Sequence, residues 1–125
     1  MVDFQNGVFI KLKRINPEKI MGDIGPLLVM GESVVSAYKG IRDYVVFTDK
    51  RVISVNAQGI TGKKRDYTSM PYSKISVFSV ETAGVFDLDS ELEMYFSGLG
   101  KVKFEFAGES DIVKIGQLIG EYALN

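Results

Sequence analysis

The chain has 125 residues and a mass of 13.9 kDa, with 46% hydrophobic and 25% charged residues, which suits one globular domain. It contains no cysteine and no histidine, which excludes disulfides, thiolate zinc sites, thiol nucleophiles and histidine-based catalysis. Lys and Arg number 15 against 16 Asp and Glu, a net charge of -1, so no overall positive charge favours nucleic acid or an anionic membrane.

The N-terminus carries Asp3 where a secretory signal is basic, and no apolar run approaches the ~20 residues that cross a bilayer. A cytoplasmic protein is therefore expected. We predict no cofactor, no nucleic-acid partner and no enzymatic activity, because the side chains that remain rarely make an active site on their own.

Residues 1–32 are predicted to form an N-terminal arm. Residues 16–18 supply a capping Asn, a Pro at the first helical position and an acid in the first turn, so a short helix should begin there and end at the following glycines. The apolar spacing within residues 7–14 favours a second helix, although a strand over 9–13 is an alternative. The apolar residues 27–30 should be buried against the main body.

From residue 33 onward, short runs rich in β-branched and aromatic residues alternate with turn residues, which is typical of an all-β chain. Seven strands are predicted, near residues 33–39, 43–48, 51–57, 64–70, 75–82, 91–97 and 101–107. Their connections are too short for crossovers, so antiparallel pairing is expected throughout.

The last segment, residues 109–124, is predicted to be an amphipathic helix with Ser110 as its N-cap. Its apolar stripe consists of Ile112, Ile115, Leu118, Ile119 and Tyr122. The chain is thus divided into an arm (1–32), a β-domain (33–107) and a helix (109–124).

Two hairpins can be aligned from their side chains. A three-residue loop at Gly98–Gly100 would place one apolar face inward. The pairs expected there are Phe96 with Val102, Met94 with Phe104, and Leu92 with Phe106.

The other hairpin turns at Asp49-Lys50 and is apolar on both faces. With residues 44, 46, 53 and 55 facing inward, Val45, Phe47 and Val52 would face outward and need a cover. The arm or another subunit could supply it, so these three residues are the candidate oligomer interface.

Two charged clusters have simpler explanations than a ligand site. Asp87, Asp89, Glu91 and Glu93 share one strand face, but the pattern lacks the glycine and the final glutamate of a calcium loop, so a solvated face is predicted and no metal. The basic run after Gly62 lacks the spacing of a nucleotide phosphate loop, and it could contact an anion or an acidic partner.

The sequence resembles the bacterial pleckstrin-homology-like (PH-like) domain family over nearly its whole length. The stretches that carry the resemblance are Gly31–Val34, Arg42–Arg51, Gly59–Lys64, Met70–Tyr72 and Phe86–Leu92. The resemblance implies a barrel of seven antiparallel strands in two nearly orthogonal sheets, capped by the C-terminal helix. It also implies a binding module without known catalysis whose members form cyclic homo-oligomers, with a pentamer expected here.

The leading functional prediction is a self-assembling interaction domain that presents a repeated polar surface to a protein partner. The alternative is a membrane-peripheral module that binds anionic headgroups through Lys39, Arg42, Lys63, Lys64 and Arg65. Phosphoinositide binding is not expected, because the basic pattern of the eukaryotic domains is interrupted here by Asp43 and Tyr44. A metal-dependent carboxylate enzyme is the third possibility.

Overall fold

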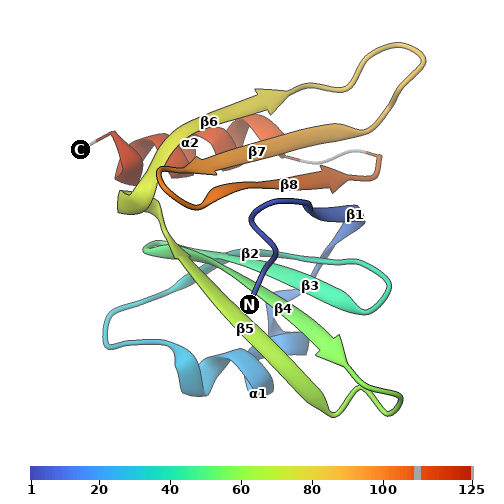
Figure 1. The fold of residues 1–125 in the computed structure, drawn as a ribbon, viewed down its shortest axis with the longest axis vertical. Helices are drawn as coiled ribbons and strands as arrows, with labels where there is room; N and C mark the ends of the chain where they lie inside the picture. The colour runs from blue at the N-terminus through green and yellow to red at the C-terminus, as the bar shows by residue number, and fades with distance from the viewer. Residues whose placement is uncertain (109–110, 125) are drawn as a thin grey trace.

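The computed structural model describes residues 1–108 and 111–124, which form a mainly β domain with a C-terminal helix (Figure 1). Its eight strands are β1 (Gly7–Ile15), β2 (Val34–Lys39), β3 (Asp43–Thr48), β4 (Arg51–Gln58), β5 (Lys64–Pro71), β6 (Ile75–Glu81), β7 (Ser90–Phe96) and β8 (Gly100–Phe106). The helices are α1 (Met21–Ile24) and α2 (Ile112–Ala123), with short 3-10 turns η1 (Pro17–Ile20), η2 (Gly25–Leu27) and η3 (Tyr72–Lys74).

The strands form one curled sheet in the order β5-β4-β3-β2-β1-β8-β7-β6, and the two sheets expected are its two halves, which share β1. Figure 1 shows two splayed halves, with α2 against β6 to β8 and α1 beside β2 to β5. Edge strands β5 and β6 follow each other in sequence through η3. The mainly β PH-like fold with its capping helix is confirmed.

The predicted helix over residues 7–14 is wrong, because this segment is strand β1. Its first part pairs with β8 in parallel and its last part, Lys13–Ile15, pairs with β2, so β1 joins the two halves of the sheet. The expectation of purely antiparallel pairing is therefore also wrong.

A bend in β1 explains the misleading spacing. Residues three apart in a regular strand point to opposite faces, yet both Phe9 and Leu12 are buried in the core. Between them the register shifts, and Lys11 has a φ of 53°, which turns the chain and brings both side chains inward. This strand consequently has the apolar spacing of a helix.

The positive φ makes Lys11 a test of this bend. Lys11→Val should lower the free energy of unfolding by about 1 kcal/mol, because a β-branched residue tolerates this conformation poorly, whereas Lys11→Gly should preserve or raise it. Ile10→Gly, at an adjacent residue with ordinary backbone, should cost about 1 kcal/mol. Urea denaturation would measure all three, and a Lys11→Gly loss equal to that of Ile10→Gly would contradict the bend.

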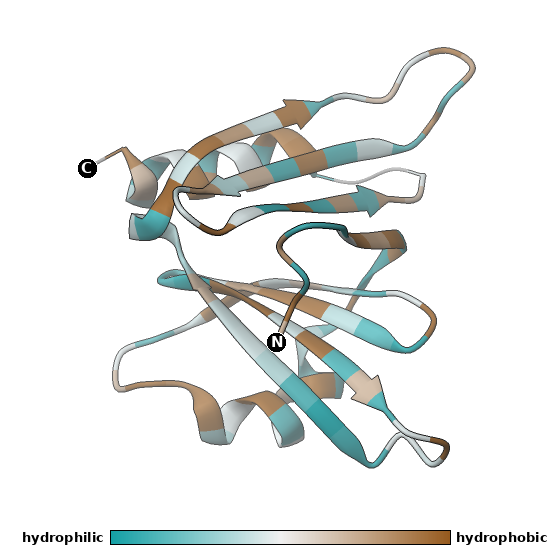
Figure 2. Ribbon diagram, in the orientation of Figure 1, coloured by the Kyte–Doolittle hydropathy of each residue, from teal (hydrophilic) through white to brown (hydrophobic). Residues whose placement is uncertain are grey.

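Two apolar clusters lie on opposite faces of β3 and β4. Val45, Phe47 and Val52 belong to the main core inside the curl, beneath α2 and β8. The other face of the hairpin packs against Ile20 and Ile24 of the arm. In Figure 2 the central strands are mostly hydrophobic, whereas edge strand β5 is mostly hydrophilic.

The predicted turn at Asp49-Lys50 is confirmed, but the assignment of the two faces was reversed. The supposed outward residues Val45, Phe47 and Val52 are each 0% exposed. Because the chain itself covers both faces, these residues offer no surface to a neighbouring subunit, and their prediction as an oligomer interface is wrong.

In the β7–β8 hairpin the predicted faces are correct but the pairing is two residues off. Met94 pairs with Val102, Leu92 with Phe104, and Ser90 with Phe106. The loop begins one residue earlier, and Gly100 lies within β8, where a Cβ would be only 2.0 Å from the Phe4 carbonyl oxygen. A shift of two residues keeps every side chain on its face, so hydrophobicity alone could not exclude it.

The helix start in the arm is confirmed, since Asn16 accepts a hydrogen bond from the Glu18 backbone N–H at 3.0 Å. The predicted burial of residues 27–30 is wrong, because Val29 is 55% and Met30 is 100% exposed. Hydrogen bonds hold this segment instead. The carboxylate of Glu32 accepts from the Val29 N–H, and Arg51 donates to the Leu27 carbonyl.

Helix α2 carries the predicted apolar stripe, with Ile112, Ile115 and Ile119 buried and Leu118 and Tyr122 partly buried against the core. Its expected N-cap, Ser110, lies outside the described residues. Tyr122 stacks on Tyr72 of η3, with ring centroids 5.8 Å apart. The helix is thus held by packing against the β5–β6 corner.

Candidate functional site

A cavity of about 390 Å³ lies between the N-terminal arm and the β2–β5 half of the sheet. The arm contributes residues from the end of β1, η1 and α1, and the sheet contributes the β2–β3 turn and parts of β4 and β5. Its lining residues are Ile15, Lys19, Ile20, Asp23, Lys39, Ile41, Arg42, Asp43, Tyr44, Val55, Ala57 and Arg65.

The charged residues around this cavity are mostly basic. Its lining contains four cationic side chains and two carboxylates, although the whole chain has a net charge of -1. Of the four, Arg65 forms an ion pair with Asp23, and Arg42 donates to the Gly59 carbonyl at 2.7 Å. Within residues 1–108 and 111–124, Lys19 and Lys39 have no carboxylate within ion-pair distance. This face therefore carries uncompensated positive charge.

Tyr44 forms part of the cavity wall with an unusual hydroxyl. The residue is 8% exposed, and its hydroxyl makes no well-formed hydrogen bond with the described residues, although the Arg65 guanidinium lies near enough to interact with it. Burial, followed by the nearby charge of Asp23, raises the pKa of Tyr44 to about 12, and the Arg65 guanidinium opposes this rise only in part. The hydroxyl therefore remains protonated and can donate a hydrogen bond at neutral pH.

Asp43 is the second carboxylate of the cavity. It begins β3 and is partly buried, and burial raises the pKa of its side chain despite a backbone hydrogen bond that lowers it. Its negative charge is thus less favourable than that of an exposed aspartate.

The structure unites three of the five predicted anion contacts, Lys39, Arg42 and Arg65, around this cavity. Lys63 and Lys64 are exposed outside its lining. Sequence reasoning missed Lys19 and Asp23, because their position depends on how the arm folds over the sheet. Tyr44 was noticed only as an interruption of a basic pattern.

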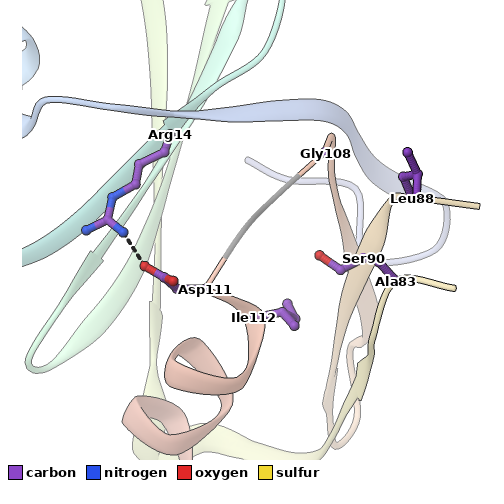
Figure 3. A pocket seen from close by; sticks show the side chains of 7 residues that line it. All are labelled: Arg14, Ala83, Leu88, Ser90, Gly108, Asp111 and Ile112. Atoms are coloured by element: carbon purple, nitrogen blue, oxygen red, sulfur yellow. Dashed lines mark hydrogen bonds and ion pairs between the residues drawn. The ribbon is translucent and has the colours of Figure 1, made fainter. Parts of the chain in front are cut away.

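A second cavity, of about 700 Å³, lies at the other end of the sheet beside the start of α2 (Figure 3). Arg14 and Asp111 form an ion pair on one side of it, Leu88 and Ala83 lie on the opposite side, and Ile112 extends from the start of α2 between them. The charges of this ion pair balance each other, so this cavity has no excess charge to attract a ligand.

The acidic cluster is divided between a loop and a strand. Asp87 accepts a hydrogen bond from the Asp89 N–H, while Glu91 and Glu93 form ion pairs with Lys103 and Lys101 at 3.1 and 2.8 Å. In the described residues no three acidic side chains lie close enough to hold a metal ion. Among residues 1–108 and 111–124, no helix has the length and apolar character needed to cross a membrane.

Comparison with known families places the fold. The model of the bacterial PH domain family matches residues 3–123. The chain belongs to this family. One relative is the uncharacterized protein YjqA of Bacillus subtilis strain 168, which is 43% identical over 118 residues, covering 93% of this chain and 94% of the relative. Another is YozO of the same organism, 31% identical over 77% of this chain and 82% of its own.

Solved structures of bacterial PH domains agree with this assignment. A DUF1696 family protein with a pleckstrin-homology domain from Shewanella loihica PV-4 is 38% identical, covers 94% of this chain and 99% of its own, and has a TM-score of 0.77. A pleckstrin homology domain from Shewanella amazonensis SB2B is 42% identical over 89% and 90% of the two chains, with a TM-score of 0.66. The family and these relatives indicate no catalytic class.

Proposed function

We propose that this PH domain is a non-catalytic interaction domain that assembles into a cyclic homo-oligomer, with five subunits expected, and presents a repeated polar surface to a protein partner. The observation that carries the proposal is the open sheet, which ends in two different edge strands, β5 and β6. Backbone groups at an unpaired edge favour the addition of another strand.

The two edges carry opposite charges. β5 begins with the exposed Lys64 and Arg65, whereas β6 ends with the exposed Glu81. Contact between the β5 edge of one copy and the β6 edge of the next therefore brings unlike charges to one interface. Such a contact uses different surfaces of the two copies, so it cannot make a symmetric dimer, and it gives a ring when the rotation between successive copies closes.

Light scattering behind a sizing column tests this proposal. The native chain should elute as one assembly of defined size. In Glu81→Lys like charges meet at the interface, so the subunit concentration at which half of the chains are assembled should rise about fivefold. Lys64→Glu in the same chain should restore assembly.

As a matched control, Lys13→Glu alters an exposed lysine on β1, in the middle of the sheet and away from both edges, and should leave the assembly unchanged. A monomer at all concentrations would overturn assembly, and a strict dimer would overturn the ring.

A further inference from the structure

We propose that the seam between the two halves of the sheet binds an extended segment of the partner protein, and that residues 1–4, the N-terminal strap, occupy this seam when the partner is absent. The strap crosses the opening between the β2–β5 half and the β6–β8 half before the chain enters β1 (Figure 1). The site explains how a protein partner is recognised, and it is complete in a single copy, so it does not depend on the ring.

The strap lies in the seam as an extended peptide would. Its side chains alternate, since Val2 and Phe4 are half-buried and pack against the main core. The residues that alternate with them, Met1 and Asp3, are exposed. The Phe4 ring meets the Phe96 ring of β7 edge to face, with the ring centroids 5.5 Å apart. The seam therefore accepts two apolar side chains that are two residues apart.

Hydrogen bonds from the backbone of the strap reach both halves of the sheet. The Val2 N–H donates to the Thr68 hydroxyl of β5 at 2.9 Å, and the Phe4 carbonyl accepts from the Lys101 N–H of β8 at 2.8 Å. Gly100 permits the second contact, because a Cβ there would lie 2.0 Å from the Phe4 carbonyl oxygen. Any extended segment carries the same backbone groups, so the seam can bind a segment other than the strap.

The strap can leave the seam without the loss of any strand pairing. It lies outside the sheet, whose first strand begins at Gly7, and a turn at residues 4–6 separates the two. The Asp3 carboxylate shapes this turn by accepting hydrogen bonds from the Gln5 and Asn6 N–H groups, at 2.8 and 3.2 Å. Terminal segments with few contacts open at a low cost in free energy. The turn is thus a hinge about which a partner displaces the strap.

The charge beside the seam indicates the charge of the partner segment. A cavity of about 290 Å³ lies next to the strap, and the sheet contributes the carboxylates of Asp43 and Asp66 to its lining. The Met1 ammonium forms an ion pair with Asp66 at 2.6 Å. A partner segment that replaces the strap should therefore carry a lysine or arginine before its two alternate apolar residues.

Fluorescence anisotropy of a dye-labelled synthetic peptide of residues 1–6 tests the site on the full chain. The native chain should bind this peptide weakly, because its own strap competes at the high effective concentration of a short linker. Phe4→Ala removes the ring that anchors the strap and should bind the peptide about tenfold more tightly. Val2→Ala is a milder change and should bind it about threefold more tightly, so the test does not depend on the stability of one variant.

Phe86→Ala is the matched control, since Phe86 is 100% exposed in the β6–β7 loop and its loss should change the affinity less than about twofold. A peptide in which Asp3 and Phe4 are exchanged has the same composition but adjacent apolar residues, and it should bind about tenfold more weakly than the original. An N-acetylated peptide lacks the ammonium group and should bind about threefold more weakly.

No gain in binding by Phe4→Ala and Val2→Ala over the native chain would overturn the site, and so would equal binding of the exchanged peptide. Light scattering of the native chain with excess peptide separates a protein partner from a second copy. Dissociation of the assembly would show that the strap of a neighbouring copy fills the seam, and it would overturn the assignment to a separate partner. An unchanged assembly supports that assignment, and a monomeric native chain would contradict the ring alone.

Discussion

Replacing Glu32 with alanine is expected to lower the free energy of unfolding by about 3–5 kcal/mol, the usual cost of breaking a buried ion pair from one side. The Glu32 side chain is 0% exposed and forms an ion pair with Arg51, whose side chain is 19% exposed. The loss should appear as a lower midpoint in urea denaturation with an unchanged slope.

The size of this effect follows from the number of groups that the carboxylate serves. It accepts two hydrogen bonds from Arg51, each at 2.9 Å, one from the Thr48 hydroxyl at 2.7 Å and one from the Val29 N–H at 3.0 Å. Alanine would leave the Val29 N–H and the Arg51 Nε–H without an acceptor, while the Thr48 hydroxyl and Arg51 Nη2 keep only the Arg51 and Leu27 carbonyls, and buried donors without partners are costly. It would also detach the arm from the β3–β4 hairpin.

The same carboxylate should make stability depend on pH. Burial alone would raise the pKa of Glu32, but hydrogen bonds from Arg51, Thr48 and Val29 outweigh burial, and the pKa lies below its ordinary value of 4.5. The stabilisation is therefore complete above the unfolded pKa and is lost as the pH falls below it. Glu32→Gln should flatten this part of the stability curve.

Glu18→Ala is the matched control, because Glu18 is an exposed acid of the same arm and has no ion pair among the described residues. Its effect should stay within about 0.5 kcal/mol. Equal losses in the two alanine variants would show that the Glu32 network does not hold the arm.

Phe104→Ala is expected to cost about 3–5 kcal/mol, because a fully buried ring is replaced by a cavity. Phe104 is 0% exposed on β8, stacks on Phe9 of β1 at 5.2 Å between ring centroids, and lies 6.4 Å from Phe47 of β3. It therefore connects both halves of the curled sheet.

Tyr95→Ala supplies the comparison, since Tyr95 lies on the neighbouring strand β7 and is 47% exposed. Its loss should remain below about 1 kcal/mol. A loss under 1 kcal/mol for Phe104→Ala in denaturant melts would contradict the burial of this ring.

Local patterns predicted each strand from β2 to β8 to within one residue at either end, and they predicted the capping helix over residues 109–124, where α2 runs from Ile112 to Ala123. They succeeded because turn residues and alternating side chains are local signals. A helix was favoured over residues 7–14, with a strand over 9–13 as the alternative, because the bend at Lys11 gives β1 a helical spacing of apolar residues. This bend lies where the pairing of β1 changes from β8 to β2. The partners of β1 lie far away in the sequence.

The site could be predicted only in part for a similar reason. Lys39, Arg42 and Arg65 were recognised by charge alone, whereas Lys63 and Lys64 have the same charge but lie outside the cavity. The predicted oligomer interface was wrong because the sequence shows only that both faces of the β3–β4 hairpin are apolar. It does not show which part of the chain packs against each face. The arm and the main core together supply both covers.

The pairing of β1 with β8 places the first strand to be made beside the last. On the ribosome, β1 leaves on the order of 90 residues before β8 is complete, and at roughly 5 to 20 residues per second this takes on the order of 5 to 20 seconds. During that time Phe9 and Leu12 lack the strand β8 with which they pair, although β2 to β5 can already pair with one another and with the last residues of β1. This domain thus completes its fold only after β8 has been made, and until then β1 is a segment for chaperones to shield.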